Sequence, residues 1–386
     1  MRHALRAAQI EPFHVMDVLA RAQALEALGR RVIHMEIGEP DFGAPEPVVE
    51  AGTRAMRDGL STYTATLGLP ALREAISGFY AAKFGIAVDS ANVAVTAGAS
   101  AGLLLALASL IDPGDEVLVA DPGYPGYRHF VRCFEGRAIA IPVTAETSFQ
   151  PTLEMVKQSW TPRTRCLLLG SPSNPTGTVI APMELERISA FIAEREGVLI
   201  VDEIYQGLVY DQQPSTALRL PGDVVVVNSF SKYFCMTGWR LGWVVLPAAR
   251  VRAFEKLAQH LFICAPTIGQ HAALAAFGPE SIDILELRRD EFRRRRDFLV
   301  PALDDLGLKV AAKPSGAFYV YANCSRFGEA GSFAVELLEQ SGVAATPGLD
   351  FGSHGTRDHI RLAYTRGMAD LKEAIDRIGS FCASRR

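Results

Sequence analysis

The sequence predicts an α/β protein with two domains: a large one around a mainly parallel central sheet, and a smaller α+β domain. The chain has 386 residues, and chains beyond ~250–300 residues usually divide into more than one domain. Apolar residues make up 49% and charged residues 21%, as in ordinary globular proteins. Between about residues 90 and 246, short apolar runs alternate with helical patterns, which is typical of parallel strands joined by helices.

Seven segments of this central region are expected to form strands. Most are continuous runs of Val, Ile and Leu rather than alternating ones, as in strands that are buried on both faces of a parallel sheet. Helices are expected between them at 101–111 and at 184–196, the second preceded by Pro182. The predicted strands are 92–96, 116–120, 137–141, 165–169, 198–201, 224–228 and 241–246.

The two ends of the chain are expected to form the smaller domain. A helical pattern covers 15–28 and ends at Gly29, and a long charged helix is expected at 280–305. Strand-like segments follow at 317–321, 343–346 and 359–363. We therefore assign 1–40 and 285–386 to the small α+β domain and 41–284 to the large α/β domain.

Charge and composition indicate no macromolecular or metal partner. The net charge of −4 and the pI of about 6.1 favour neither a nucleic-acid nor a membrane partner. The longest apolar run, 101–111, is too short to span a bilayer, and the arginines at 293–296 are interpreted as a solvent-exposed helix face. The six cysteines form no CxxC pair, and the eight histidines show no metal-ligand spacing. We expect no metal, and reduced thiols in the cytoplasm.

Polar residues follow the predicted strands, where open α/β sheets bind ligands. Lys232 comes shortly after strand 224–228, and an amine at a strand end can form an imine with an aldehyde cofactor. Asp202 directly follows strand 198–201. A buried carboxylate in that place can keep a pyridine nitrogen protonated, which makes the ring an electron sink.

The same rim offers groups for a phosphate and for a ring. Ala99 and Ser100 lie at the start of the helix after strand 92–96, where backbone N–H groups bind anions. Ser229, Ser231 and Arg240 add hydroxyls and a cation. For the ring itself, Asn174 and Tyr205 can donate to a phenolic oxygen, and Tyr124 offers an aromatic face for stacking.

Each of these residues also has an ordinary structural explanation. Asp202 could cap a helix, the segment at Asn174 is a favourable turn, and Tyr124 could anchor a loop by packing. A different hypothesis comes from 98–102 (GASAG), which fits the G-x-S-x-G turn of serine α/β-hydrolases. Ser100 would be the nucleophile, and the histidine of the triad would be His354 or His359, which come late in the chain. That hydrolase reading lacks an HGGG-type segment and leaves the other rim residues unexplained.

Taken together, the segments resemble the class I/II aminotransferases, the aspartate aminotransferase-like enzymes of pyridoxal-5′-phosphate (PLP) fold type I. Each segment alone is common, but the whole set occurs in the family's order, within a likeness that runs from near residue 10 to about 370. The segments are 37–42 (IGEPDF), 63–68 (YTATLG), 174–177 (NPTG), 202–205 (DEIY), 229–232 (SFSK) with 238–240 (GWR), and 360–362 (IRL).

The resemblance implies a role for each residue. Lys232 would form the Schiff base with PLP and move protons, Asp202 would pair with the pyridine nitrogen, and Arg361 with the backbone of Gly38 would hold the substrate α-carboxylate. Tyr63 would reach the phosphate of a neighbouring subunit, which implies a homodimer. The remaining cofactor contacts would be Asn174 and Tyr205 to the ring oxygen, Tyr124 stacked on the ring, and Ala99, Ser100, Ser229, Ser231 and Arg240 around the phosphate.

The predicted activity is ping-pong transamination between an L-amino acid and a 2-oxo acid (EC 2.6.1.-). The same residues would serve a PLP-dependent β-eliminating C–S lyase, and none of them separates the two reactions. The segment 10–15 (IEPFHV), which by resemblance lies over the pocket, is partly apolar, and we identify no second arginine for a side-chain carboxylate. Both points favour neutral or hydrophobic donors over aspartate, without identifying the amino acid.

Overall fold

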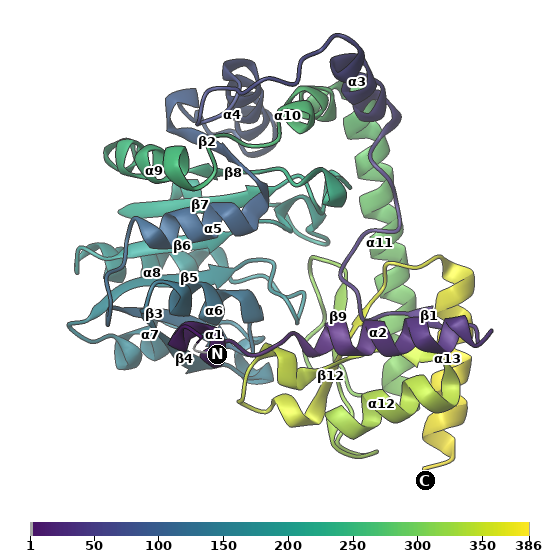
Figure 1. Cartoon of the computed structure of the whole chain (residues 1–386). Coiled ribbons are helices and arrows are strands. Elements are labelled where there is room, and N and C mark those ends of the chain that lie inside the picture. Colours follow the sequence, from purple (N-terminus) through teal and green to yellow (C-terminus); the bar gives the residue numbers. More distant parts are fainter. Residues whose placement is uncertain (1–2, 386) are drawn as a thin grey trace.

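The computed structural model describes residues 3–385 and is built around a seven-stranded sheet (Figure 1). The strand order is β2-β8-β7-β6-β5-β3-β4. Strand β8 is antiparallel to both neighbours, and the other five strands from β7 to β4 are parallel. The strands are β2 (Val93–Thr96), β3 (Glu116–Asp121), β4 (Arg137–Pro142), β5 (Thr164–Gly170), β6 (Val198–Asp202), β7 (Asp223–Ser229) and β8 (Gly242–Val245).

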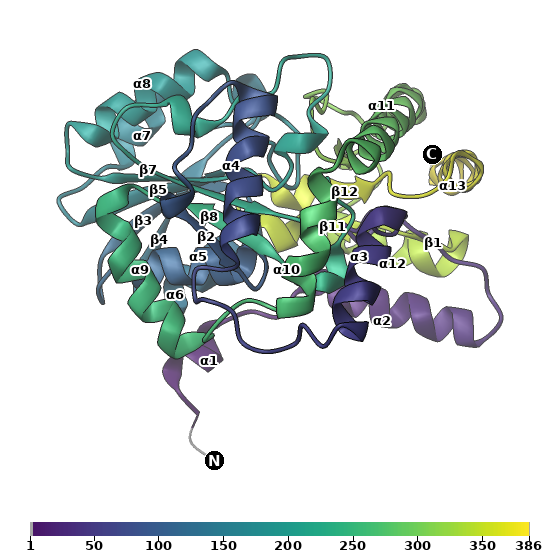
Figure 2. The same ribbon diagram turned by 90° about the horizontal axis from the view of Figure 1, so that it is seen from above.

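This sheet confirms the seven predicted strands, each within one residue at either end. Both faces of the sheet are buried, because alternate residues of one strand enter two different apolar clusters: Leu167 and Leu169 belong to one, and Cys166 and Leu168 to the other. Figure 2 shows the helices that cover the two faces. They are α4 (Pro70–Phe84), α7 (Leu153–Ser159) and α8 (Pro182–Ala193) on one side, and α5 (Gly98–Ala108), α6 (Pro125–Cys133) and α9 (Ala248–Leu261) on the other.

The second, smaller part contains an antiparallel sheet of order β11-β12-β9. A two-stranded parallel pair, β1 with β10, brings the two ends of the chain side by side. The strand predicted at 343–346 is split into β10 and β11, and β1 was not predicted. The strands are β1 (Ile33–His34), β9 (Tyr319–Asn323), β10 (Val343–Ala344), β11 (Thr346–Pro347) and β12 (His359–Ala363).

Helices from both ends of the chain complete this part. α2 (His14–Ala27) and α11 (Pro279–Leu306) confirm the helices predicted at 15–28 and 280–305, and Gly29 after α2 has a left-handed φ of 82°. α11 runs from beside α3 (Glu46–Arg57) to the small sheet, where it packs against β9 and α13 (Met368–Ala383) (Figure 1). The domain boundaries themselves stay a prediction. The remaining α-helices are α1 (Leu5–Gln9), α10 (Thr267–Leu274) and α12 (Ala330–Ser341).

The prediction that residues 293–296 form a solvent-exposed face is wrong for half of the run. Arg293 and Arg294 are exposed, but Arg295 and Arg296 are buried, with 3% and 0% exposure. Arg295 pairs with Asp41 at 2.8 Å. The physical reason is geometric: four consecutive residues span more than a full turn of an α-helix, so some of them must face the protein.

Within residues 3–385, no helix is long and apolar enough to cross a membrane.

Candidate active site

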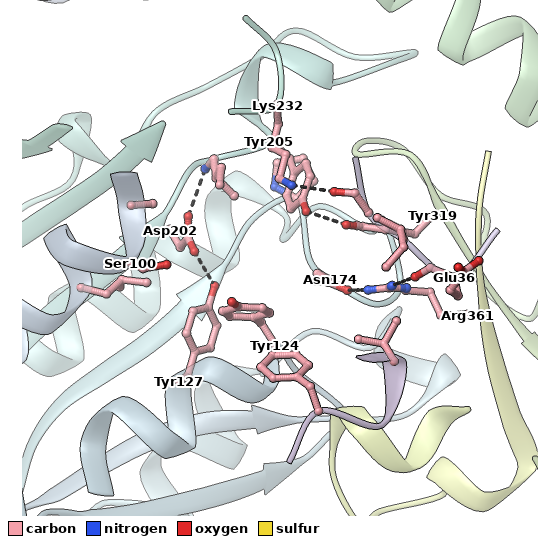
Figure 3. Close-up of a pocket in the computed structure, with 18 residues that line it drawn as sticks. Glu36, Ser100, Tyr124, Tyr127, Asn174, Asp202, Tyr205, Lys232, Tyr319 and Arg361 are labelled. Atoms are coloured by element: carbon pink, nitrogen blue, oxygen red, sulfur yellow. Dashed lines mark hydrogen bonds between the residues drawn. The ribbon is translucent and has the colours of Figure 1, made fainter. Parts of the chain in front are cut away.

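A cavity of about 200 Å³ lies at the carboxyl ends of the central strands (Figure 3). The strand ends supply its polar groups because parallel strands all end at the same edge of the sheet. Its walls come from both parts of the molecule. The lining residues are Phe13, Val15, Glu36, Ile37, Gly38, Ala99, Ser100, Leu103, Tyr124, Tyr127, Pro172, Asn174, Asp202, Ile204, Tyr205, Lys232, Tyr319 and Arg361.

Asp202 is the last residue of β6 and is buried, with 5% exposure. One carboxylate oxygen accepts a hydrogen bond from the Tyr127 hydroxyl at 2.9 Å, and the other accepts one from the Ile204 N–H at 3.1 Å. Burial raises the pKa of Asp202 to about 6, although these two hydrogen bonds and Lys232 act to lower it. The carboxylate is therefore ionised at neutral pH and is held in a fixed orientation toward the cavity.

Lys232 reaches the cavity from the segment that follows β7. Its Nζ donates to the backbone oxygen of Gly38 at 2.6 Å. Burial lowers the pKa of Lys232 to about 8, and Arg361 and Arg240 act in the same direction while Glu39 opposes them. A substantial fraction of neutral amine, the form that attacks carbonyl carbons and accepts protons, is therefore available near pH 8.

Gly38 is a point of close approach between the two ends of the chain. A Cβ atom at this position would lie 1.9 Å from the hydroxyl oxygen of Tyr319. Only glycine therefore allows the backbone of 36–38 to pass beside β9. This packing places the backbone of Gly38 next to both Lys232 and Tyr319.

Arg361, on β12, extends its guanidinium toward Asn174 (Figure 3). Nη1 donates to Asn174 Oδ1 at 3.0 Å, and Nη2 donates to the Glu36 backbone oxygen and to Thr346 Oγ1, the latter at 3.2 Å. The Nε atom is buried and has no hydrogen-bond partner. A buried guanidinium with an unused donor is suited to an anionic group that enters the cavity.

Tyrosines shape the space between Asp202 and Arg361. The hydroxyls of Tyr205 and Tyr319 are hydrogen-bonded at 2.8 Å. The rings of Tyr124 and Tyr127 meet edge to face, with centroids 5.2 Å apart. Burial raises the pKa of Tyr124 to about 12, so its hydroxyl is neutral in this cavity.

The residues predicted to surround a phosphate converge on the start of α5, although only Ala99 and Ser100 line the cavity. A Cβ atom on Gly98, which has a φ of 80°, would lie 2.7 Å from Nη2 of Arg240, so glycine here lets the guanidinium approach the helix start. Ser229 Oγ donates to Ser231 Oγ at 3.0 Å. Both serines are buried.

Tyr63, the residue expected to reach a neighbouring subunit, lies apart from the cavity of its own chain. Its side chain is 78% exposed, and it does not contribute to the lining. Within one chain it therefore has no part in the site.

Among the lining residues that the sequence analysis did not identify, Tyr127 and Tyr319 make hydrogen bonds to predicted site residues. Tyr127 donates to Asp202, and Tyr319 bonds Tyr205 and limits residue 38 to glycine. Tyr127 lies three positions after Tyr124, on the same side of α6, and this spacing was a signal that could have identified it. Tyr319 stood inside a predicted strand, and nothing in its local sequence distinguishes it from a core residue.

The serine-hydrolase alternative has no support in this arrangement. Ser100 lines the cavity, but no histidine of the described residues does. His359 instead stacks on Tyr321, with ring centroids 4.6 Å apart, and its Nδ1 lies 2.8 Å from the Gly355 oxygen. Among the described residues, Ser100 therefore has no histidine in the cavity to act as its general base.

Comparison with known proteins gives one consistent result. Residues 30–378 match the family described as aminotransferase class I and II. The chain is 41% identical to a (5-formylfuran-3-yl)methyl phosphate transaminase of Methanocaldococcus jannaschii, covering 97% of this chain and 98% of that protein. It is 39% identical to a valine–pyruvate aminotransferase of Mycobacterium tuberculosis, covering 99% of each. A crystal structure of an aminotransferase from Mycobacterium tuberculosis superposes with a TM-score of 0.96 at 39% identity, covering 100% of both chains.

The family match spans most of the chain, the relatives are aligned over almost their whole length, and the structural agreement includes both sheets. The chain therefore belongs to the class I and II aminotransferases and is an aminotransferase of the aspartate aminotransferase-like fold type I.

Proposed function

We propose that this aminotransferase uses PLP, held through an imine bond to Lys232, to move an amino group from an L-amino acid to a 2-oxo acid by a ping-pong mechanism. The observation that carries the proposal is the placement of Asp202, Lys232 and Arg361 around one cavity. The class I and II family uses PLP, and three features of the cavity fit that group. They are an ionised carboxylate at the end of β6, a partly buried amine of lowered pKa, and the Arg240 guanidinium close to Gly98 at the start of α5.

The residues would hold the cofactor as follows. Asp202 would pair with the pyridine N–H, Asn174 and Tyr205 would donate to the ring oxygen, and Tyr124 would cover one face of the ring. Bound PLP supplies an electron-poor ring that accepts the electron pair left when a substrate Cα loses its proton. The phosphate contacts would be Ala99, Ser100, Ser229, Ser231 and Arg240.

The chain's own groups would then orient the substrate and move its proton. Arg361 would bind the α-carboxylate with two parallel hydrogen bonds, together with the backbone of Gly38, and so fix Cα beside Lys232. The Lys232 amine, once displaced by the amine of the substrate, would be placed to take up the Cα proton and to return it, as general base and then general acid. Tyr127 would keep the Asp202 carboxylate aligned with the ring nitrogen.

The cavity favours donors with neutral side chains. Among the described residues that line it, Lys232 and Arg361 are the only cationic side chains, and both have roles above. The other walls include the apolar residues Phe13, Val15, Ile37 and Leu103.

A second chain would complete the site with the exposed Tyr63, which would reach the phosphate of the neighbouring subunit in a homodimer.

A single-turnover experiment tests the proposed reaction. Purified protein saturated with PLP is mixed, in turn, with each of a panel of L-amino acids in the absence of a 2-oxo acid. The imine of PLP with Lys232 would make the protein yellow. We expect the preferred donors to abolish this absorption and to release one equivalent of 2-oxo acid per chain, with no ammonia. A second 2-oxo acid should then restore the colour.

The β-eliminating C–S lyase gives the opposite pattern. A cysteine-type donor would release ammonia and a 2-oxo acid over many turnovers without any second 2-oxo acid, and the yellow band would persist. That outcome, with no stoichiometric half-reaction for any donor in the panel, would contradict the proposed transamination.

A further inference from the structure

The start of α2 forms one wall of the cavity. Phe13 and Val15 line the cavity, and the ring of Phe13 lies 6.3 Å from that of Tyr124. Phe13 is the N-cap residue of α2 and offers no side-chain acceptor. The first N–H groups of a helix have no acceptor within the helix, so they must find one elsewhere.

A carboxylate more than 300 residues away supplies that acceptor. Oδ1 of Asp350 accepts from the His14 N–H at 2.8 Å, and Oδ2 accepts from the Val15 N–H at 2.9 Å. Asp350 is buried, with 2% exposure. Hydrogen bonds from backbone N–H groups to a carboxylate are charge-assisted, and the positive end of the helix dipole strengthens them further. Asp350 therefore fixes the helix start that carries both wall residues.

Asp350 and its neighbours are themselves bonded to the segment that carries Tyr124. Arg128 donates to its backbone oxygen at 3.1 Å, and the Gly123 N–H donates to the next carbonyl, that of Phe351, at 2.8 Å. The carboxylate of Asp121, at the end of β3, accepts from the Ser353 N–H at 3.0 Å. The carboxylate that holds the wall is thus anchored to the loop that carries Tyr124.

We propose that Asp350 is a positioning residue that sets the donor selectivity of the enzyme, by holding Phe13 and Val15 against the space that the substrate side chain occupies. The inference rests on the proposed transamination and adds the substrate class to it: amino acids with large apolar side chains. Asp350 does not line the cavity, so it acts through α2.

The variant Asp350→Asn keeps the shape of the side chain but places an NH₂ group against one of the two N–H donors. This change should loosen the wall formed by Phe13 and Val15. The ratio of kcat/KM for the parent's best large apolar donor to kcat/KM for alanine should then fall by about fivefold to tenfold, the equivalent of one well-made hydrogen bond. The change should lie in KM for the large donor, and PLP saturation should not change. Hydrogen exchange at residues 13–17 should become faster.

Glu329→Gln is the matched control. Glu329 is the N-cap residue of α12 and accepts from the Gly331 and Ser332 N–H groups at 3.1 and 3.3 Å, and it does not line the cavity. It should show a similar loss of helix capping without any change in donor selectivity. If Asp350→Asn changes kcat/KM equally for every donor, or leaves selectivity unchanged while residues 13–17 exchange faster, the proposal is overturned.

His14→Pro is a second variant that leaves Asp350 intact. It removes one of the two donors at the first helical position, where proline is well tolerated, and it should shift selectivity in the same direction. Hydrogen exchange is independent of activity. If the parent enzyme transaminates no donor, the proposed function is refuted, but hydrogen exchange still shows whether Asp350 anchors α2. If the enzyme is active and both variants keep the parent's selectivity, only the role of Asp350 is refuted.

Discussion

Replacing Asp202 with alanine is expected to reduce kcat by several orders of magnitude, more than the ~10²–10⁴ of a typical acid–base group. The reason is electrostatic. The carboxylate of Asp202 is buried in the cavity wall at the end of β6, and under the proposed function it is the group that would keep the pyridine nitrogen protonated. Without it, the ring would still bind through Lys232 but would no longer accept the electron pair from Cα.

Steady-state kinetics with the best donor of the panel measures this effect, and PLP saturation is read from the visible absorption of the same samples. Tyr127→Phe is the matched control, because it removes one hydrogen bond to the carboxylate and leaves the charge in place. We expect it to cost about tenfold at most, the value of one hydrogen bond. Turnover of Asp202→Ala within tenfold of the parent would refute the assigned role.

Arg361→Lys should bind PLP normally yet lose amino-acid affinity by about 2–4 kcal/mol, or roughly 30- to 1,000-fold. Lysine keeps the charge but not the planar fork that matches a carboxylate with two parallel hydrogen bonds. The contacts of the guanidinium with Asn174 and Thr346 fix the direction of that fork. Titration of the visible spectrum with amino acids gives the dissociation constants.

Simple amines without a carboxylate should bind Arg361→Lys and the parent about equally, which separates carboxylate recognition from cofactor chemistry. Arg377→Lys is a suitable control, because the Arg377 guanidinium on α13 is also held by hydrogen bonds but does not line the cavity. It donates to the backbone oxygens of Arg31, Ser341 and Gly342. Loss of PLP by Arg361→Lys, or unchanged affinity for amino acids, would show that Arg361 is structural.

The central sheet could be predicted because its strands are buried on both faces. Mainly apolar runs such as 224–228 are typical of strands that are buried on both faces of a parallel sheet. The polar residues that follow these runs indicate the edge of the sheet where a ligand binds. Asp202 and Lys232 were found in this way. The small domain was harder, because its strands are short: β10 and β11 contain two residues each and are separated only by Ala345.

Contacts between distant segments could not be predicted. Tyr127 meets Asp202 across 75 residues, and Asp350 meets His14 across 336, so neither pair leaves a local pattern. The prediction that residues 293–296 are exposed failed for a related reason. A run of four arginines predicts a solvent-exposed face when charge alone is considered. Only the packing of α11 shows that two of them are buried, Arg295 paired with Asp41 and Arg296 with Asp211.

The most direct test of the account is to locate the cofactor on the chain. The PLP-saturated protein is reduced with borohydride, digested, and examined by peptide mass spectrometry. The account predicts a yellow protein before reduction and one pyridoxyl phosphate group per chain afterwards, attached to Lys232. A colourless protein that takes up no PLP, or a label on any other lysine, would contradict it.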